Sequence, residues 1–130
     1  MIRRFTLCML LAATVIFTIY GETTLRPYWL KNHIDTYTLA DWFPNLLAPM
    51  ILVLLYTLIK EVNDKAVLFR ATCSFVAGLI IYEIVQLFIP SRTFDHKDII
   101  ASVVGGAIIY GVVLGVFKLF PPLPDQVSQK

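Results

Sequence analysis

The chain has 130 residues, of which 58% are hydrophobic and only 15% are charged. Soluble domains carry about 25% charged residues and about 45–50% apolar ones, so this composition is typical of a membrane protein. The formal net charge is only +2, and no basic stripe with interleaved aromatic residues is present, which argues against a nucleic-acid partner. The polar stretches are too short to bury a core of their own, and we therefore predict a single membrane domain over residues 1–130.

Four apolar runs are long enough to cross a bilayer, and they predict an all-α membrane protein. The first run covers residues 5–21, and it is either an uncleaved membrane helix or a signal peptide. The membrane helix is favoured because the residues from Tyr20 to Thr23 form a poor cleavage site. The other three predicted spans cover residues 43–59, 66–89 and 99–120.

Prolines are expected to shape the ends of these spans. We expect Pro27 to break any continuous helix after the first span, and a short helix to form at the membrane surface over residues 34–39. Pro44 and Pro49 lie in the first turns of the second span, where Pro49 is expected to introduce a kink. Pro90 is expected to end the third span.

Capping residues precede the last two spans. Asn63 or Asp64 is expected to cap the third span, because a short polar side chain can accept a hydrogen bond from the first turn of a helix. Asp95 and Asp98 have the spacing of an N-cap residue and its partner at the third helical position. Both carboxylates also suit the positive end of a helix dipole.

The distribution of lysine and arginine predicts the orientation in the membrane. With the N-terminus inside, the inner segments carry seven basic residues and the outer segments carry four. The inner ones are Arg3, Arg4, Lys60, Lys65, Arg70, Lys118 and Lys130, and the outer ones are Arg26, Lys31, Arg92 and Lys97. We therefore predict four transmembrane helices in an up-down bundle, with the N-terminus and the C-terminus both cytoplasmic.

Cysteine and histidine residues predict no metal site and no cofactor. Cys8 and Cys73 both lie inside apolar runs, and we expect them to be small buried side chains rather than a disulfide or metal pair. His33 stands alone, and His96 has no second metal ligand placed near it by the sequence.

Small residues mark two faces of the last predicted span. Gly105 and Gly106 lie on or near the face that carries Asp98 and Ser102, whereas a glycine-x-x-x-glycine pattern over residues 111–115 lies on the other face. Small residues let helix backbones approach closely in lipid. Packing within the chain and contact in a homo-oligomer explain the second face equally well.

A polar cluster between the third and fourth spans is the candidate binding site. Glu83 and Gln86 share a face near the end of the third span, where an ionised carboxylate needs a physical reason to persist. Glu83 therefore either carries a proton or pairs with a cation, and Arg92, just beyond the Pro90 turn, is the nearest candidate. We predict a network at the outer surface of the membrane, and the candidate binding residues are Glu83, Gln86, Arg92, Asp95, Asp98 and Ser102.

The same residues form a pattern that resembles the VanZ-like family of small bacterial integral membrane proteins. The pattern consists of Glu83-x-x-Gln86, then Phe88-x-Pro90-x-Arg92-x-Phe94-Asp95-x-x-Asp98-Ile99, then Gly105-Gly106, preceded by Asp41-x-x-Pro44-Asn45. The resemblance covers the chain from about Asp41 to Gly115, and it departs at Ser102, where an asparagine is usual. It implies a location in the bacterial cytoplasmic membrane. The namesake of the family is associated with low-level resistance to the glycopeptide teicoplanin.

Several functions are compatible with this pattern. The favoured one is a non-enzymatic protein whose outer cleft binds a lipid head group, a glycopeptide or a partner membrane protein, and so alters the envelope's response to antibiotics. The alternatives are an intramembrane enzyme acting on a lipid-linked substrate, with Glu83 as general base and Asp95 or Asp98 holding a metal, and a proton-coupled carrier. The enzyme is disfavoured because no nucleophile–base pair is visible around Ser91 or Ser102. A purely structural role of the cluster is the remaining interpretation.

Overall fold

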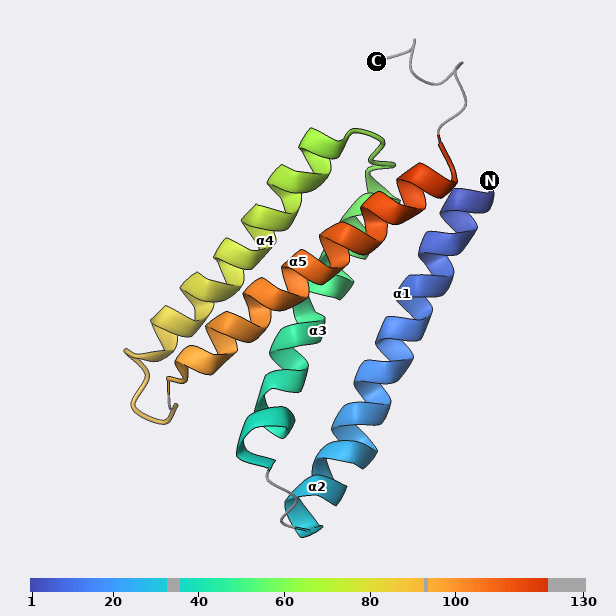
Figure 1. Cartoon of the computed structure of the whole chain (residues 1–130). Helices are drawn as coiled ribbons and strands as arrows, with labels where there is room; N and C mark the ends of the chain where they lie inside the picture. The colour runs from blue at the N-terminus through green and yellow to red at the C-terminus, as the bar shows by residue number, and fades with distance from the viewer. Residues whose placement is uncertain (33–35, 93, 122–130) are drawn as a thin grey trace.

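The structure is a computed structural model that describes residues 1–32, 36–92 and 94–121, with the backbone alone for residues 36–41. Every regular element in this part of the chain is helical (Figure 1), and the elements are α1 (Ile2–Tyr20), the π-helical η1 (Gly21–Leu25), α2 (Arg26–Asn32), α3 (Thr36–Ile59), α4 (Lys65–Gln86) and α5 (His96–Leu119). Four helical stretches are long and apolar enough to cross a membrane: Ile2–Asn32, Trp42–Ile59, Lys65–Gln86 and His96–Leu119. The prediction of an all-helical protein with four membrane-length helices is confirmed.

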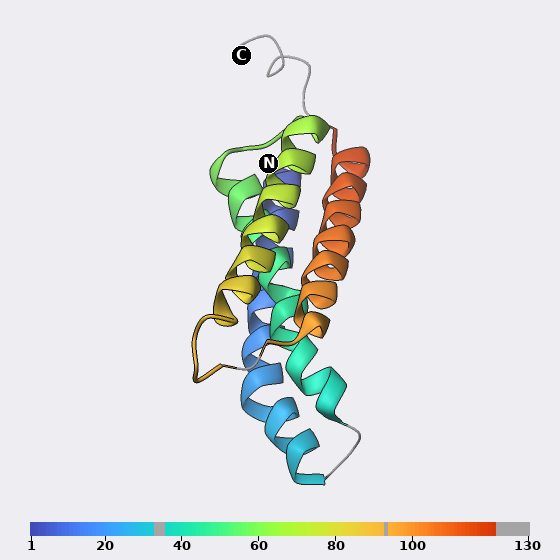
Figure 2. The same ribbon diagram turned by 90° about the vertical axis from the view of Figure 1, so that its left-hand side faces the viewer.

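The helices lie side by side, with α5 in contact with both α3 and α4 and with α1 packed mainly on α3. One end of the molecule, which we call the terminal end, holds the start of α1, the connection at residues 60–64 and the end of α5 (Figures 1 and 2). The other end, which we call the hairpin end, holds α2, the start of α3 and the hairpin between α4 and α5. The candidate binding residues therefore gather at the hairpin end.

Polar contacts tie the helices together at the terminal end. The Arg4 guanidinium lies 2.9 Å from the Glu61 carboxylate in the connection between α3 and α4. Arg3 donates a hydrogen bond to the side-chain oxygen of Asn63, and its guanidinium carbon lies 5.2 Å from the centre of the Phe117 ring of α5. The start of α1 is thus anchored both to this connection and to the end of α5.

Both predicted aspartate caps are present. The Asp64 carboxylate accepts a hydrogen bond from the Ala66 backbone N–H at 2.9 Å, and that of Asp95 accepts one from the Lys97 N–H, also at 2.9 Å. Asp98 lies in the first turn of α5, as its spacing from Asp95 predicted. These local contacts set where α4 and α5 begin.

The helix α4 ends earlier than predicted, at Gln86 rather than at residue 89. The N–H groups of residues 87–89 bond to carbonyls three residues back, which tightens the backbone into turns before Pro90. The ring of a proline disfavours the α conformation in the residue that precedes it, so the helical geometry is lost before the proline itself.

The expectation that Pro27 breaks the helix is wrong, since helical backbone continues from Ile2 to Asn32. The helical geometry changes just before the proline. There η1 is π-helical, and the Arg26 N–H bonds to the Gly21 carbonyl five residues back. Proline normally clashes with the carbonyl four residues before it, and a wider π turn relieves that clash.

The predicted surface helix over residues 34–39 falls partly outside the described residues. The backbone of residues 36–39 belongs to α3 and not to a separate helix. The side chains of residues 33–41, including that of His33, are outside the described part of the structure. Pro44 and Pro49 both lie in the interior of α3 rather than in its first turns as expected, because the helix begins at Thr36 and not at residue 43.

The core lies where α1, α3, α4 and α5 meet near the terminal end. Its fully buried side chains include Val53, Leu54, Leu68, Ile109 and Val113.

The prediction that Cys8 and Cys73 are buried is wrong, because both are exposed on the outer surface of the helices as free thiols. A membrane span presents apolar side chains to lipid as readily as to its neighbours, so hydrophobicity alone does not show which face of such a helix is buried.

Candidate binding site at the hairpin end

Two adjacent glycines place α5 between α3 and α4. The Cα of Gly105 lies so close to α3 that an added Cβ would overlap the Leu46 carbonyl oxygen, and an added Cβ at Gly106 would meet the side chain of Val76 on α4. Glycines permit this approach because they carry no side chain. The close contact fixes the preceding turns of α5, with Asp98 and Ser102, between the same two helices.

Ser102 links α5 to the proline-containing turn of α3. Its side chain is almost fully buried, and its hydroxyl donates a hydrogen bond of 3.4 Å to the backbone carbonyl of Asn45. Pro49 lies four residues after Asn45 and has no N–H, so the helix itself leaves this carbonyl without its usual donor. Sequence reasoning missed the contact, although the four-residue spacing from Asn45 to Pro49 marks the carbonyl that needs a partner.

We expect Ser102→Ala to lower the free energy of unfolding by about 1 kcal/mol, because a buried carbonyl loses its donor while little volume is lost. Denaturant unfolding of the purified protein in mixed micelles measures the change. Ser74→Ala is the matched control, since the Ser74 hydroxyl bonds only to the Arg70 carbonyl of its own helix on an exposed surface. Equal losses in the two variants would contradict a specific role of Ser102.

Glu83 and Gln86 face the interior of the helices. The exposed fraction is 4% for Glu83 and 7% for Gln86, and Thr72 on the same face is also buried. The shared face of α4 predicted from the sequence is therefore confirmed. The Gln86 side chain approaches the Glu83 carboxyl group, while the Glu83 Oε2 atom is buried with no hydrogen-bond partner in the described part of the chain.

The predicted direct pair between Glu83 and Arg92 is wrong. No ion pair within 4.0 Å joins these two residues in the described ranges, and Arg92 is exposed. The helix α4 stops at Gln86, and Arg92 in the turns that follow is exposed.

The two aspartates lie at the start of α5, with Asp95 as its N-cap and Asp98 in its first turn. Asp95 and Asp98 are both half-buried, and their charges both act on Glu83. Capping explains the position of Asp95, and its carboxylate also lies 3.8 Å from the His96 ring nitrogen Nδ1. The structure thus brings Glu83, Gln86, Asp95 and Asp98 together, places Ser102 one turn deeper on α5, and leaves Arg92 at the rim.

The arrangement offers several oxygen acceptors at a buried position of the membrane segment. Among the residues described, no three His, Cys, Asp or Glu side chains are grouped so that they could hold a metal ion. Asp41, which belongs to the quoted sequence pattern, has its side chain outside the described part.

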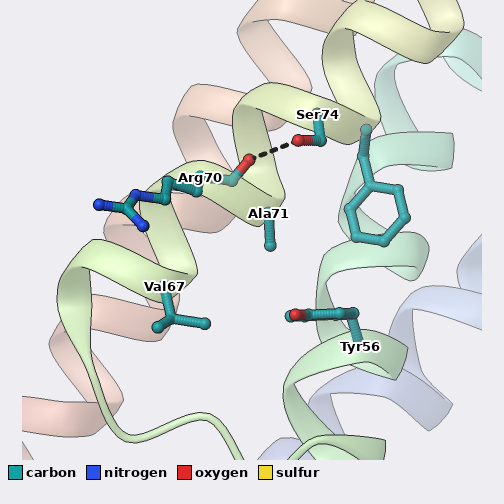
Figure 3. A pocket seen from close by; sticks show the side chains of 6 residues that line it. Tyr56, Val67, Arg70, Ala71 and Ser74 are labelled. Atoms are coloured by element: carbon teal, nitrogen blue, oxygen red, sulfur yellow. Dashed lines mark hydrogen bonds between the residues drawn. The ribbon is translucent and has the colours of Figure 1, made fainter.

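Two cavities lie away from this cluster. The first has a volume of about 310 Å³ and lies between α3 and α4. Tyr56 and Val67 point into it from opposite sides, whereas Arg70 points away (Figure 3). The second, of about 660 Å³, lies at the terminal end and is lined by residues that include Arg3, Arg4 and Glu61. Neither cavity includes a candidate binding residue predicted from the sequence.

Comparison with known proteins gives one family match. The family model described as VanZ/LLP1 matches residues 4–119, which includes all four membrane-length helices apart from the first two residues of α1. No match was found in the comparisons with curated proteins and with solved structures.

Proposed function

The chain belongs to the VanZ/LLP1 family, and on this premise we propose that it is a non-enzymatic protein of the bacterial cytoplasmic membrane that alters the envelope's response to glycopeptide antibiotics such as teicoplanin. Its four membrane-length helices support a multi-pass protein. In this proposal residues 1–130 form one membrane domain, and the cluster at the hairpin end is its binding site.

The proposed orientation is an up-down arrangement with both termini in the cytoplasm. It is supported by the grouping of basic residues. By the bounds of the helices, the terminal end holds Arg3, Arg4, Lys60, Lys65 and Lys118, while the hairpin end holds Arg26, Lys31, Arg92 and Lys97. Cytoplasmic segments of membrane proteins carry an excess of lysine and arginine. The hairpin end with its polar cluster then faces the cell exterior.

One observation carries the proposed site: a glutamate inside a membrane-length helix is 4% exposed, and one of its carboxyl oxygens has no hydrogen-bond partner in the described part of the chain. Inserting an ionised carboxylate at the centre of a membrane helix costs about 2.5–3.5 kcal/mol, whereas leucine inserts favourably. A glutamate in a membrane-length helix is therefore a candidate functional residue. We propose that Glu83 and Gln86 bind a polar group of a lipid, a glycopeptide or a partner membrane protein, with Asp95 and Asp98 at the entrance.

The test compares Glu83→Gln with Arg92→Ala in cells that depend on this protein for reduced teicoplanin susceptibility. We expect Glu83→Gln to abolish the reduced susceptibility at a normal membrane level of the protein, because the substitution keeps the shape of the side chain and removes its charge. Arg92→Ala should have a smaller effect, since Arg92 lies at the rim. The measurements are the minimal inhibitory concentration and the protein level by immunoblot.

Glu22→Gln is the comparison variant, because Glu22 also lies at the hairpin end and is half-buried, but its carboxylate pairs with Arg26 at 3.1 Å. It should leave susceptibility unchanged. Unaltered susceptibility in the Glu83 variant would refute the site, and a wild-type protein with no effect on susceptibility would refute the function. Turnover of a lipid-linked substrate by the purified wild type would instead support the enzyme alternative.

A further inference from the structure

The cavity at the terminal end is the larger of the two described above. Its volume is about 660 Å³, and it lies where the start of α1, the connection at residues 60–64 and the end of α5 meet (Figure 1). Its charged side chains are those of Arg3, Arg4 and Glu61. Apolar side chains form much of the remaining lining, among them Leu7, Leu58 and Leu119. Such a lining suits a ligand that has both a charged group and an apolar part.

Arg3 is a cation whose hydrogen-bonding capacity is only partly used. It is held at the cavity by Asn63, which accepts from its Nη2 atom, and by the Phe117 ring, whose centre lies 5.2 Å from its guanidinium carbon. Its Nη1 atom has no hydrogen-bond partner among the residues that the structure describes, and none of their carboxylates lies within 4.0 Å of the guanidinium. A charged group that has left water is normally paired. Because Arg3 is half-buried and its side chain is flexible, a small rotation presents its N–H groups to an anion in the cavity.

Glu61 is the acidic side chain of the cavity, and it is already engaged. Its carboxylate lies 2.9 Å from the Arg4 guanidinium, and both side chains are largely exposed. With two arginines and one glutamate, the side chains that line the cavity carry a net charge of +1. The first turn of α1 holds no acidic residue and no side-chain cap, so the positive end of its helix dipole is not neutralised locally. The cavity therefore favours an anion.

The position of the cavity indicates which class of anion it meets. It lies at the ends of two membrane-length helices, where the phosphate groups of a bilayer are found, and its apolar lining can receive an acyl chain. The planar guanidinium of arginine matches the geometry of a phosphate group, and basic pockets between membrane helices bind the head groups of anionic lipids.

We propose that the cavity at the terminal end binds an anionic phosphate group, with Arg3 as its main partner. The phosphate belongs either to an anionic phospholipid, whose acyl chain lies along the apolar lining, or to free inorganic phosphate. This second site lies at the opposite end of the molecule from the hairpin-end cluster. It rests neither on the function proposed above nor on the proposed orientation in the membrane.

The experiment measures the thermal unfolding midpoint of the purified full-length chain in phosphatidylcholine nanodiscs. Phosphatidylglycerol replaces part of the lipid in one arm, and inorganic phosphate is added in another, with chloride at the same ionic strength as the reference. We expect at least one of the two to raise the midpoint of the wild type by about 3 °C or more. A response to the lipid alone identifies a phospholipid, and a response to inorganic phosphate shows that the phosphate group suffices. A wild type that responds in neither arm would overturn the proposal.

Arg3→Gln tests the main partner, and Arg70→Gln is its matched control. Both substitutions remove one positive charge, but Arg70 is exposed on α4 and lines the other cavity. Each shift is measured against the same variant without added anion, so the stability that Arg3→Gln loses through Asn63 and Phe117 does not enter the comparison. We expect Arg3→Gln to lose most of the shift and Arg70→Gln to keep it. Equal responses of the two variants would indicate attraction by the overall charge of the protein and would overturn the site.

Glu61→Gln tests the same site through a residue that is exposed and does not hold Arg3 in place. The substitution removes the carboxylate from the lining and releases Arg4, so half of the maximal shift should be reached with less phosphatidylglycerol or phosphate. Glu22→Gln makes the same change of charge at the hairpin end, where Glu22 pairs with Arg26, and should leave the half-maximal point unchanged. An unchanged or weaker response of Glu61→Gln, or an equal gain in both variants, would contradict the proposal.

Discussion

Gly105→Ala should destabilise the protein by about 3 kcal/mol, which is at the upper end of the range for overpacked cores. The added Cβ would overlap the Leu46 carbonyl oxygen, and it would also lie 2.9 Å from both the Leu46 carbonyl carbon and Cγ of Pro49. Two of these atoms are backbone atoms and the third belongs to a rigid ring, so no side chain can rotate away. The helices α3 and α5 would have to separate, and the Ser102 bond to Asn45 would be lost with them.

The matched control is Gly111→Ala on the same helix. An added Cβ at Gly111 meets nothing within 4 Å, and alanine favours a helix over glycine by about 1 kcal/mol. We therefore expect the control to be neutral or slightly stabilising. Denaturant unfolding in mixed micelles and the protein level in the membrane measure both variants. Equal destabilisation of the two would show that α5 does not pack on α3 through Gly105, and a destabilised Gly111 variant alone would indicate a packed surface there.

Leu54→Ala should be the second most damaging of the substitutions considered, with a loss of about 2–4 kcal/mol. Leu54 is fully buried in the core, at 0% exposure, so truncation leaves a cavity that the surrounding helices cannot fill. In lipid there is little hydrophobic driving force between helices, and packing contacts supply much of the stability. The loss of these packing contacts therefore lowers the free energy of unfolding.

Leu55→Ala provides the comparison, because the adjacent Leu55 is 39% exposed on the outer surface of α3. Lipid chains can occupy the space left by the truncated side chain, so we expect a change below about 0.5 kcal/mol. Both variants are unfolded in mixed micelles under identical conditions. If Leu55→Ala cost as much as Leu54→Ala, the outer surface of α3 would have to be packed against another protein rather than against lipid.

Local sequence signals located most of the helices correctly. Asp64 and Asp95 cap α4 and α5 because the capping oxygen and the N–H it accepts from are two residues apart, so no distant part of the chain is needed. Where two local preferences compete, the sequence was less informative. Pro27 lies within continuous helical backbone because a π turn precedes it, and α4 ends before residue 89 because Pro90 acts on the residues before it.

The burial of two candidate residues could be predicted from the sequence, whereas their contacts could not. The burial of Glu83 and Gln86 followed from their shared face, since no lipid-facing position would retain both polar groups. The partner of Glu83 was assigned wrongly, because Arg92 is near in the sequence but its direction depends on the turns that follow α4. The contact from Ser102 to Asn45 joins residues 57 positions apart, and it depends on how α5 crosses α3.

By itself, the sequence determined the number and approximate limits of the membrane-length helices, their caps and the inward face of α4. These features depend on periodicity and on contacts within a few residues, because a chain in lipid must satisfy its backbone groups within each helix. Only the tertiary structure decided which helices touch, that the cysteines face outward, and that Arg92 is exposed and forms no ion pair with Glu83 in the described ranges. Apolar side chains suit lipid and protein alike, so the pairing of helices depends on close packing at positions such as Gly105 and Gly106, which composition and periodicity do not reveal.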